Sequence, residues 1–148
     1  MSERGFEGLD FYRDSLKLLK AAYRLAGSLP DYERYNLTDQ LRRAAVSIGL
    51  NIAEGYGRYH FLDRLRFLYI ARGSLNETLS CFIIAEQLEY CDAAQMESTR
   101  QLVSSIEKNL NGYCRSIRQL QQGGDEFGVR YTAEEHTLYI VPSAEMAE

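Results

Sequence analysis

The stretch QLRRAAVSIGLNIAEGYGR, residues 40–58, combines a helical pattern with polar residues at regular helical spacing. Its apolar side chains form one stripe, made of Leu41, Ala45, Ile48 and Ile52. Ser47, Asn51 and Glu54 stand at i, i+4 and i+7, so they share a second face of the same helix. A catalytic site, a ligand site and a buried polar network between helices would all produce this pattern.

Helical periodicity continues on both sides of this stretch. An amphipathic stripe precedes it, made of Leu9, Tyr12, Leu16, Leu19, Tyr23 and Ala26, and the segment 28–36 with Pro30 breaks that helix. After it, residues 61–90 are apolar around much of the helix circumference, and a last stripe over residues 96–120 ends at the GGD of residues 123–125. Four helices with short connections predict an all-α, antiparallel up-down four-helix bundle over residues 1–122.

Single residues sharpen these helix boundaries. Thr38 is predicted to be the N-cap of the second helix. Gly55 and Gly57 are predicted to supply the left-handed residue that stops this helix. Gly73 lies inside the third pattern, where close contact between helices would compensate for its low helix propensity.

Composition places the chain among soluble single-domain proteins. It has 148 residues, of which 45% are hydrophobic and 26% are charged. No apolar run reaches the roughly 18 residues of a membrane span, and the N-terminal stretch has no apolar core of a signal peptide. Three cysteines without a CxxC pair indicate free thiols in a reducing compartment. We therefore expect a cytoplasmic protein with no membrane partner.

The net charge of −4 conceals an asymmetry along the chain. Residues 34–72 carry seven arginines against three acids, whereas residues 123–148 carry Arg130 against six acids. The basic segment suits an anionic partner, although a solvated face has the same composition. The final segment is predicted to be a loosely ordered acidic tail, with a small β-hairpin or a strand added to a partner as the alternative.

No catalytic, cofactor-binding or metal-binding residues can be assigned from the sequence. The chain has two histidines, His60 and His136, and lacks the Glu-x-x-His pairs of di-metal helical bundles. It contains no GxSxG, Walker or dinucleotide-binding pattern, and its cysteines fall on helical patterns or at a helix end. We therefore predict that the protein is not an enzyme.

The polar stripe is best explained by contacts between the second and third helices. If these helices pack antiparallel, Ser74 and Glu77 can meet the stripe, and arginines are available to pair the carboxylates. The predicted buried polar network consists of Arg43, Ser47, Asn51, Glu54, Ser74 and Glu77. An acid/base or ligand site using Glu54 or Glu77 is the less favoured alternative.

Two blocks of sequence resemble a known family. RRAAVSIGLNIAEGYGR (42–58) and RFLYIARGSLNETL (66–79) are similar to the bacterial four-helix-bundle proteins encoded in intervening sequences of 23S ribosomal RNA genes. The family pattern looks like R-A-x-x-S-I-x-x-N-I-A-E-G-x-x-R followed by I-A-x-G-S-L-x-E. The resemblance covers roughly residues 8–122. Gly49 stands where many members have proline, and either residue loosens the helix at this point.

The resemblance implies a four-helix bundle without enzymatic activity that assembles into a ring, typically a homopentamer. Related accessory proteins of diversity-generating retroelements are basic pentamers that bind nucleic acid and partner a reverse transcriptase. We therefore predict an adaptor that binds RNA or DNA. Its candidate contacts are the arginines near the turn after the second helix and the tyrosines between them, which are Arg42, Arg58, Arg64, Arg66, Tyr56 and Tyr59. A pI of 5.3 is low for such a protein, so a scaffold that docks a protein partner through residues 123–148 is the alternative.

Overall fold

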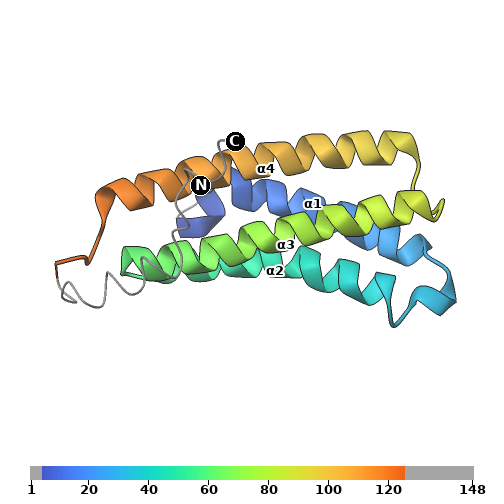
Figure 1. The fold of residues 1–148 in the computed structure, drawn as a ribbon, viewed down its shortest axis with the longest axis horizontal. Helices are drawn as coiled ribbons and strands as arrows, with labels where there is room; N and C mark the ends of the chain where they lie inside the picture. The colour runs from blue at the N-terminus through green and yellow to red at the C-terminus, as the bar shows by residue number, and fades with distance from the viewer. Residues whose placement is uncertain (1–4, 126–148) are drawn as a thin grey trace, which may run out of the picture.

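Four antiparallel α-helices form the part of the chain that the structure, a computed structural model, describes, which is residues 5–125 (Figure 1). The elements in chain order are η1 (Gly5–Gly8), α1 (Asp10–Ser28), η2 (Asp31–Glu33), α2 (Leu37–Gly57), α3 (Phe61–Gln87) and α4 (Ala93–Leu120). α1 packs against α2 and α4, and α3 packs against the same two helices. This arrangement confirms the predicted all-α up-down bundle. Residues 126–148, most of the predicted acidic tail, lie outside the described residues.

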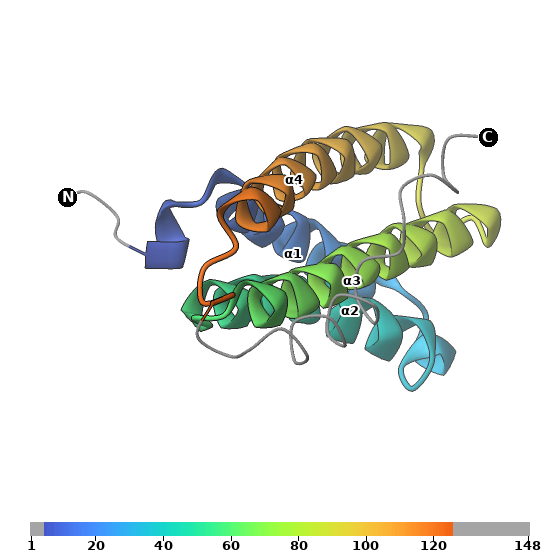
Figure 2. The ribbon, with the colours of Figure 1, turned by 60° about the vertical axis from the view of Figure 1, so that its left-hand side comes forward.

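The core runs along the whole bundle between the four helices. Figure 2 shows α3 running alongside α2, with α4 above them in that view. Fully buried leucine, isoleucine and phenylalanine side chains fill the interior, and they include Leu18, Leu41, Ile52, Leu68, Phe82 and Leu110. Burial of these apolar surfaces is the main stabilising term for a bundle of this size.

The buried face of α1 differs from the predicted stripe. The buried positions of α1 are Phe11, Ser15, Leu18, Ala22, Leu25 and Ala26. Of the predicted stripe, Leu16 and Tyr23 are exposed, and Tyr12 and Leu19 are only partly buried. The apolar arc of α1 is wide, and Tyr12, Leu16 and Leu19 lie on its flank, in the groove with α2, outside the buried face.

The ends of α2 also differ from the prediction. Asn36 is the N-cap residue, and Thr38 is buried inside the first turn. The buried Glu33 carboxylate takes the capping role, because the backbone N–H of Leu37 donates to Glu33 Oε2 at 3.3 Å. At the other end, the chain leaves the helix through an extended Arg58, so no left-handed glycine stops α2.

Gly55 of α2 and Gly73 of α3 do not have the roles predicted for them. Gly55 lies where α2 and α3 approach closely, since a Cβ there would lie 3.0 Å from the carbonyl oxygen of Arg64. Gly73 is exposed, and a Cβ there would meet nothing within 4 Å, so the predicted close contact is absent from the described chain. The last helix ends at Leu120, before the GGD, with Gln121 in the left-handed region at φ 48°.

Candidate nucleic-acid interface

The turn between α2 and α3 meets the last turns of α4 at one end of the bundle. The backbone N–H of Phe61, the first residue of α3, donates to the carbonyl oxygen of Gln122 at 3.0 Å. Just after it, Gly123 adopts φ 81°, and a Cβ there would lie 3.2 Å from the ring of Tyr59. The two segments that meet here, residues 54–66 and 113–122, together carry five arginines against Glu54 and Asp63. This end of the bundle is therefore locally basic.

Arg64 is held between two tyrosine rings at this end. Its guanidinium carbon lies 5.9 Å from the ring centroid of Tyr56 and 5.8 Å from that of Tyr113. Its Nη2 donates to the Tyr113 hydroxyl at 2.6 Å, whereas Nη1 reaches Gln122 Oε1 only at 3.5 Å. The buried Nε–H of Arg64 has no acceptor among the described residues. An arginine has five N–H donors, so this fixed guanidinium retains capacity for further acceptors.

Arg58 lies beside Arg64 and is more open to solvent. Its Nη2 and Nε donate to Glu54 Oε1 at 2.6 and 3.1 Å, and its guanidinium lies over the ring of Phe67 at 4.8 Å. This pair is surface-exposed on both sides, so it is weak and can exchange partners with a more acidic ligand. The guanidinium carbon of Arg66 also lies near the Phe67 ring, 5.6 Å from its centroid.

A cleft of about 530 Å³ opens between these side chains. Its lining consists of Tyr56, Gly57, Arg58, Tyr59, Arg64, Tyr113, Ser116, Ile117, Leu120 and Gln122. Four of the six predicted nucleic-acid contacts therefore converge on one cleft, and Arg66 lies next to them on α3. The cleft combines aromatic faces with cationic donors, a combination suited to a ligand that carries both an aromatic ring and a negative charge.

Arg42 lies away from this cleft. It is near the start of α2, so about 16 residues of helix, or roughly 24 Å, separate it from Arg58. Its guanidinium lies over the ring of Tyr23 at 5.6 Å, and it lines a separate groove together with Asp31 and Arg34. The structure thus removes Arg42 from the predicted cluster. Spacing along a helix explains the difference, because α2 carries Arg42 and Arg58 to its opposite ends.

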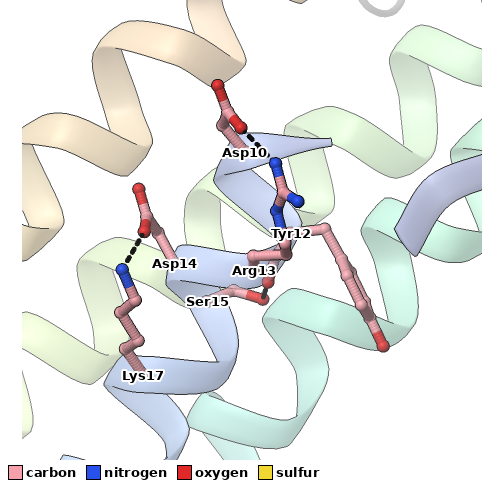
Figure 3. Close-up of polar contacts among 6 residues, drawn as sticks. All are labelled: Asp10, Tyr12, Arg13, Asp14, Ser15 and Lys17. Carbon is pink, nitrogen blue, oxygen red and sulfur yellow. Dashed lines mark hydrogen bonds and ion pairs between the residues drawn. The ribbon is translucent and has the colours of Figure 1, made fainter. Parts of the chain in front are cut away.

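α1 contributes no excess of positive charge to the basic end. Figure 3 shows Arg13 paired with Asp10, at 2.6 Å, and Lys17 paired with Asp14, at 3.1 Å. Each pair links successive turns of the same helix and neutralises its own charge locally. The ring of Tyr12 extends toward α2 in this view, and a Cβ on Gly49 of α2 would lie 3.5 Å from it. The basic character of this end therefore comes from α3, α4 and the turn before α3.

α4 contributes side chains to this cleft that were not among the predicted contacts. Tyr113 continues the apolar stripe of α4 after Leu110, so its spacing indicated a core position. It is in fact partly buried, with its ring also 5.3 Å from that of Phe11 and its hydroxyl on Arg64. Burial raises the pKa of the Tyr113 hydroxyl, and the neighbouring Arg64 charge partly opposes this shift. The one signal in the sequence was that this residue is a tyrosine, because the hydroxyl of a buried tyrosine usually needs a hydrogen-bond partner.

The predicted buried polar network exists in part and lies at a seam between α2 and α3. Ser74 Oγ donates to Ser47 Oγ at 2.8 Å, and Asn51 Nδ2 donates to the same oxygen at 3.0 Å. Thr78 extends this chain on α3 by donating to the carbonyl oxygen of Ser74 at 2.8 Å. These contacts hold the two helices in register without any charged group.

The three charged members of the predicted network lie at the surface, contrary to the prediction. Arg43 pairs with Asp39 on its own helix, Glu54 pairs with Arg58, and Glu77 is exposed. Glu77 borders a cavity of about 290 Å³ between α2 and α3 that is also lined by Glu33 and Cys81. The stripe lies on the flank of α2, where the short serine and asparagine side chains meet α3 and the longer charged ones extend into solvent.

The three cysteines are free, buried thiols. Burial raises the pKa of each of them, and it raises the pKa of Cys114 to about 11. They therefore stay protonated at neutral pH and are weak nucleophiles. Within residues 5–125, no group of three or more His, Cys, Asp or Glu side chains is placed to hold a metal ion. None of the helices in this range has both the length and the apolarity required to cross a membrane.

Comparisons with known proteins place this architecture in a family. A crystal structure of a protein of unknown function from the S23 ribosomal protein family of Bacteroides thetaiotaomicron is similar, with a TM-score of 0.65 and 26% sequence identity. The match covers 70% of this chain and 97% of that one. Among curated proteins no match is found. The family model of 23S rRNA-intervening sequence proteins matches residues 7–112, well over half of the chain. The chain therefore belongs to the family of 23S rRNA-intervening sequence proteins.

Proposed function

We propose that this protein is a non-enzymatic, ring-forming accessory protein of the cytoplasm that binds nucleic acid through the basic end of its bundle. The observation that carries the proposal is the convergence of Tyr56, Arg58, Tyr59 and Arg64 on one cleft with Tyr113. Arginines bind phosphate oxygens through paired donors, and tyrosines stack on bases. The resemblance to retroelement accessory proteins adds a reverse transcriptase as an expected protein partner.

The overall acidity of the chain does not oppose this proposal. Five acids and one arginine lie in residues 126–148, so the net negative charge comes from the segment that follows the described residues in the sequence. Phosphate binding responds to the local potential of a patch more than to the total charge of the protein. A ring would place several copies of the basic end together, so a modest excess of charge in each subunit would act as a large field.

Ring formation is supported by two different apolar surfaces on one subunit. One is a groove of about 240 Å³ between α1 and α2, where Tyr12, Leu16 and Leu50 are among the lining residues and Leu50 is 65% exposed. The other is the outward face of α3, where Ile70 and Ile84 are exposed and Gly73 leaves open space between them. A closed ring of more than two subunits uses two unlike surfaces on each subunit, and this chain offers such a pair.

Charge reversal at the basic end tests nucleic-acid binding. Arg58→Glu should weaken binding of a labelled RNA at low salt by roughly tenfold or more, because a phosphate contact becomes a repulsion in every subunit. Arg100→Glu is the matched control, since Arg100 is an exposed arginine on α4 far from the cleft. Fluorescence anisotropy measures both affinities, and circular dichroism checks that both variants fold.

Equal affinity for the wild type and Arg58→Glu would remove the cleft from the binding surface. Equal losses in Arg58→Glu and Arg100→Glu would mean that binding follows total charge and not this site.

A further inference from the structure

We propose, on the basis of the function proposed above, that the cleft at the basic end accepts an unpaired nucleobase, so that single-stranded nucleic acid is the preferred ligand. The inference concerns the shape and lining of the cleft, which a phosphate-binding surface alone would not require. Three tyrosine side chains, Tyr56, Tyr59 and Tyr113, line it together with the apolar side chains of Ile117 and Leu120.

The apolar part of the cleft is exposed in a way that phosphate binding does not explain. Leu120 is 80% exposed and Tyr59 is 51% exposed at the rim of the cleft. A phosphate gains nothing from these surfaces, whereas the flat face of a base buries them and stacks on an aromatic ring. The volume of about 530 Å³ falls within the range of roughly 300–1,000 Å³ that is typical of small-ligand sites.

The guanidinium of Arg64 is preorganised to bind the ligand in this cleft. The two flanking tyrosine rings and the Tyr113 hydroxyl already fix its guanidinium, so little side-chain freedom remains to be lost on binding. Its Nη1 makes only the 3.5 Å contact with Gln122 and retains donors for an acceptor of the base or of its phosphate. Arg58, at the rim, is placed to contact the neighbouring phosphate.

Polar side chains at the cleft edge complete the site. Gln122 presents an amide, which can donate to and accept from a base edge. The Ser116 hydroxyl donates to the carbonyl oxygen of Tyr113 at 2.7 Å, which leaves its lone pairs as acceptors. The bases of a duplex are already stacked and paired, so a duplex presents phosphates and groove edges but no free base face. The lining therefore favours a single strand.

The test compares strand states at constant length. A labelled single-stranded oligonucleotide and the duplex made by annealing its complement are titrated with the full-length protein, once as RNA and once as DNA. We expect the single strand to bind at least about tenfold more tightly than the duplex. A single strand that contains 2-aminopurine should also lose fluorescence on binding, because that base would stack on a tyrosine.

A variant pair separates stacking from charge. Tyr59→Leu should weaken single-strand binding by roughly fivefold to a hundredfold and abolish the change in 2-aminopurine fluorescence, whereas Tyr59→Phe should retain both. Tyr35→Leu is the matched control, because Tyr35 is an exposed tyrosine next to an arginine, Arg34, outside the cleft.

The outcomes distinguish this inference from the proposed function. Salt-sensitive binding that is equal for single strand and duplex, and unchanged in Tyr59→Leu, would overturn the base-binding cleft and leave nucleic-acid binding intact. The same holds for tighter binding of the duplex. Failure to bind either form at low salt would overturn both proposals together.

Discussion

At the scale of single residues, the buried thiol of Cys114 should make the stability of the bundle depend on pH in the alkaline range. Cys114 is 2% exposed, and burial raises the pKa of its thiol from 9.0 to about 11. Well below pH 9 the thiol is protonated in both the folded and the unfolded chain. Between pH 9 and pH 11 the unfolded thiol loses its proton while the folded one keeps it, so rising pH favours unfolding.

This difference predicts a pH-dependent loss of stability that Cys114→Ala removes. The free energy of unfolding of the wild type should fall by roughly 2 kcal/mol more than that of Cys114→Ala between pH 8.5 and pH 11. Urea unfolding followed by circular dichroism at several pH values measures both curves. The comparison between the two proteins is needed because burial also raises the pKa of Cys81, Cys91 and Tyr113. Parallel curves for the two proteins would contradict the argument.

At the scale of the helices, the contact between α2 and α3 positions the cleft. A Cβ on Gly55 would lie 3.0 Å from the carbonyl oxygen of Arg64 and 3.1 Å from Leu68 Cγ. The carbonyl belongs to the backbone of α3 and cannot move without the helix. Any residue larger than glycine at position 55 therefore displaces the segment that carries Arg64.

Two glycine substitutions at the end of α2 should have opposite effects. Gly55→Ala should destabilise the fold by about 1–2 kcal/mol, because overpacking outweighs the gain in helix propensity, and should also weaken nucleic-acid binding. Gly57→Ala should be neutral or stabilise by up to about 1 kcal/mol, since a Cβ there meets nothing within 4 Å. Urea unfolding and anisotropy measure both effects. If Gly55→Ala were as stable as Gly57→Ala, the close approach would not limit this position.

The helices themselves were predictable from the sequence because apolar periodicity over 19 to 28 residues is a strong signal. Their ends were less so. Thr38 looked like the N-cap, but Glu33, three residues before Asn36, supplies the carboxylate that the first turn needs. Gly55 looked like a helix stop, yet it serves a contact with α3. Contacts between separate elements determine the N-terminal cap of α2 and the role of Gly55. Such contacts cannot be read from the local sequence.

In the candidate site too, the residues close in sequence were predictable, whereas those brought in by another helix were not. Tyr56, Arg58, Tyr59 and Arg64 are close in sequence, so their clustering could be predicted from a single turn. Tyr113 and Gln122 join them only because α4 runs antiparallel to α3. Likewise, periodicity placed Glu54 and Glu77 on one side of the bundle but could not distinguish its interior from the flank where they lie.

At the scale of the whole molecule, the proposed ring requires that subunits meet through their exposed apolar surfaces. Leu50→Glu should convert the ring into smaller species, because it places a charge in the groove between α1 and α2. Leu50 is 65% exposed, so the fold of each subunit should be retained. Leu120→Glu is the control at a more exposed leucine outside both apolar surfaces.

Size-exclusion chromatography with light scattering gives the mass of each variant. An unchanged mass for Leu50→Glu, or a wild type that is monomeric at micromolar concentration, would contradict the assembly through this groove.

The central claim, that the basic end of the bundle binds nucleic acid, is tested most directly by one salt titration. Fluorescence anisotropy with a labelled RNA would be recorded from low to near-physiological salt, on wild-type protein of known assembly mass. We predict binding at low salt that weakens steeply, with the logarithm of the affinity falling linearly as phosphate contacts release counterions. Absence of binding even at low salt would contradict the claim, and the arginines of this end would then serve the bundle and its assembly alone.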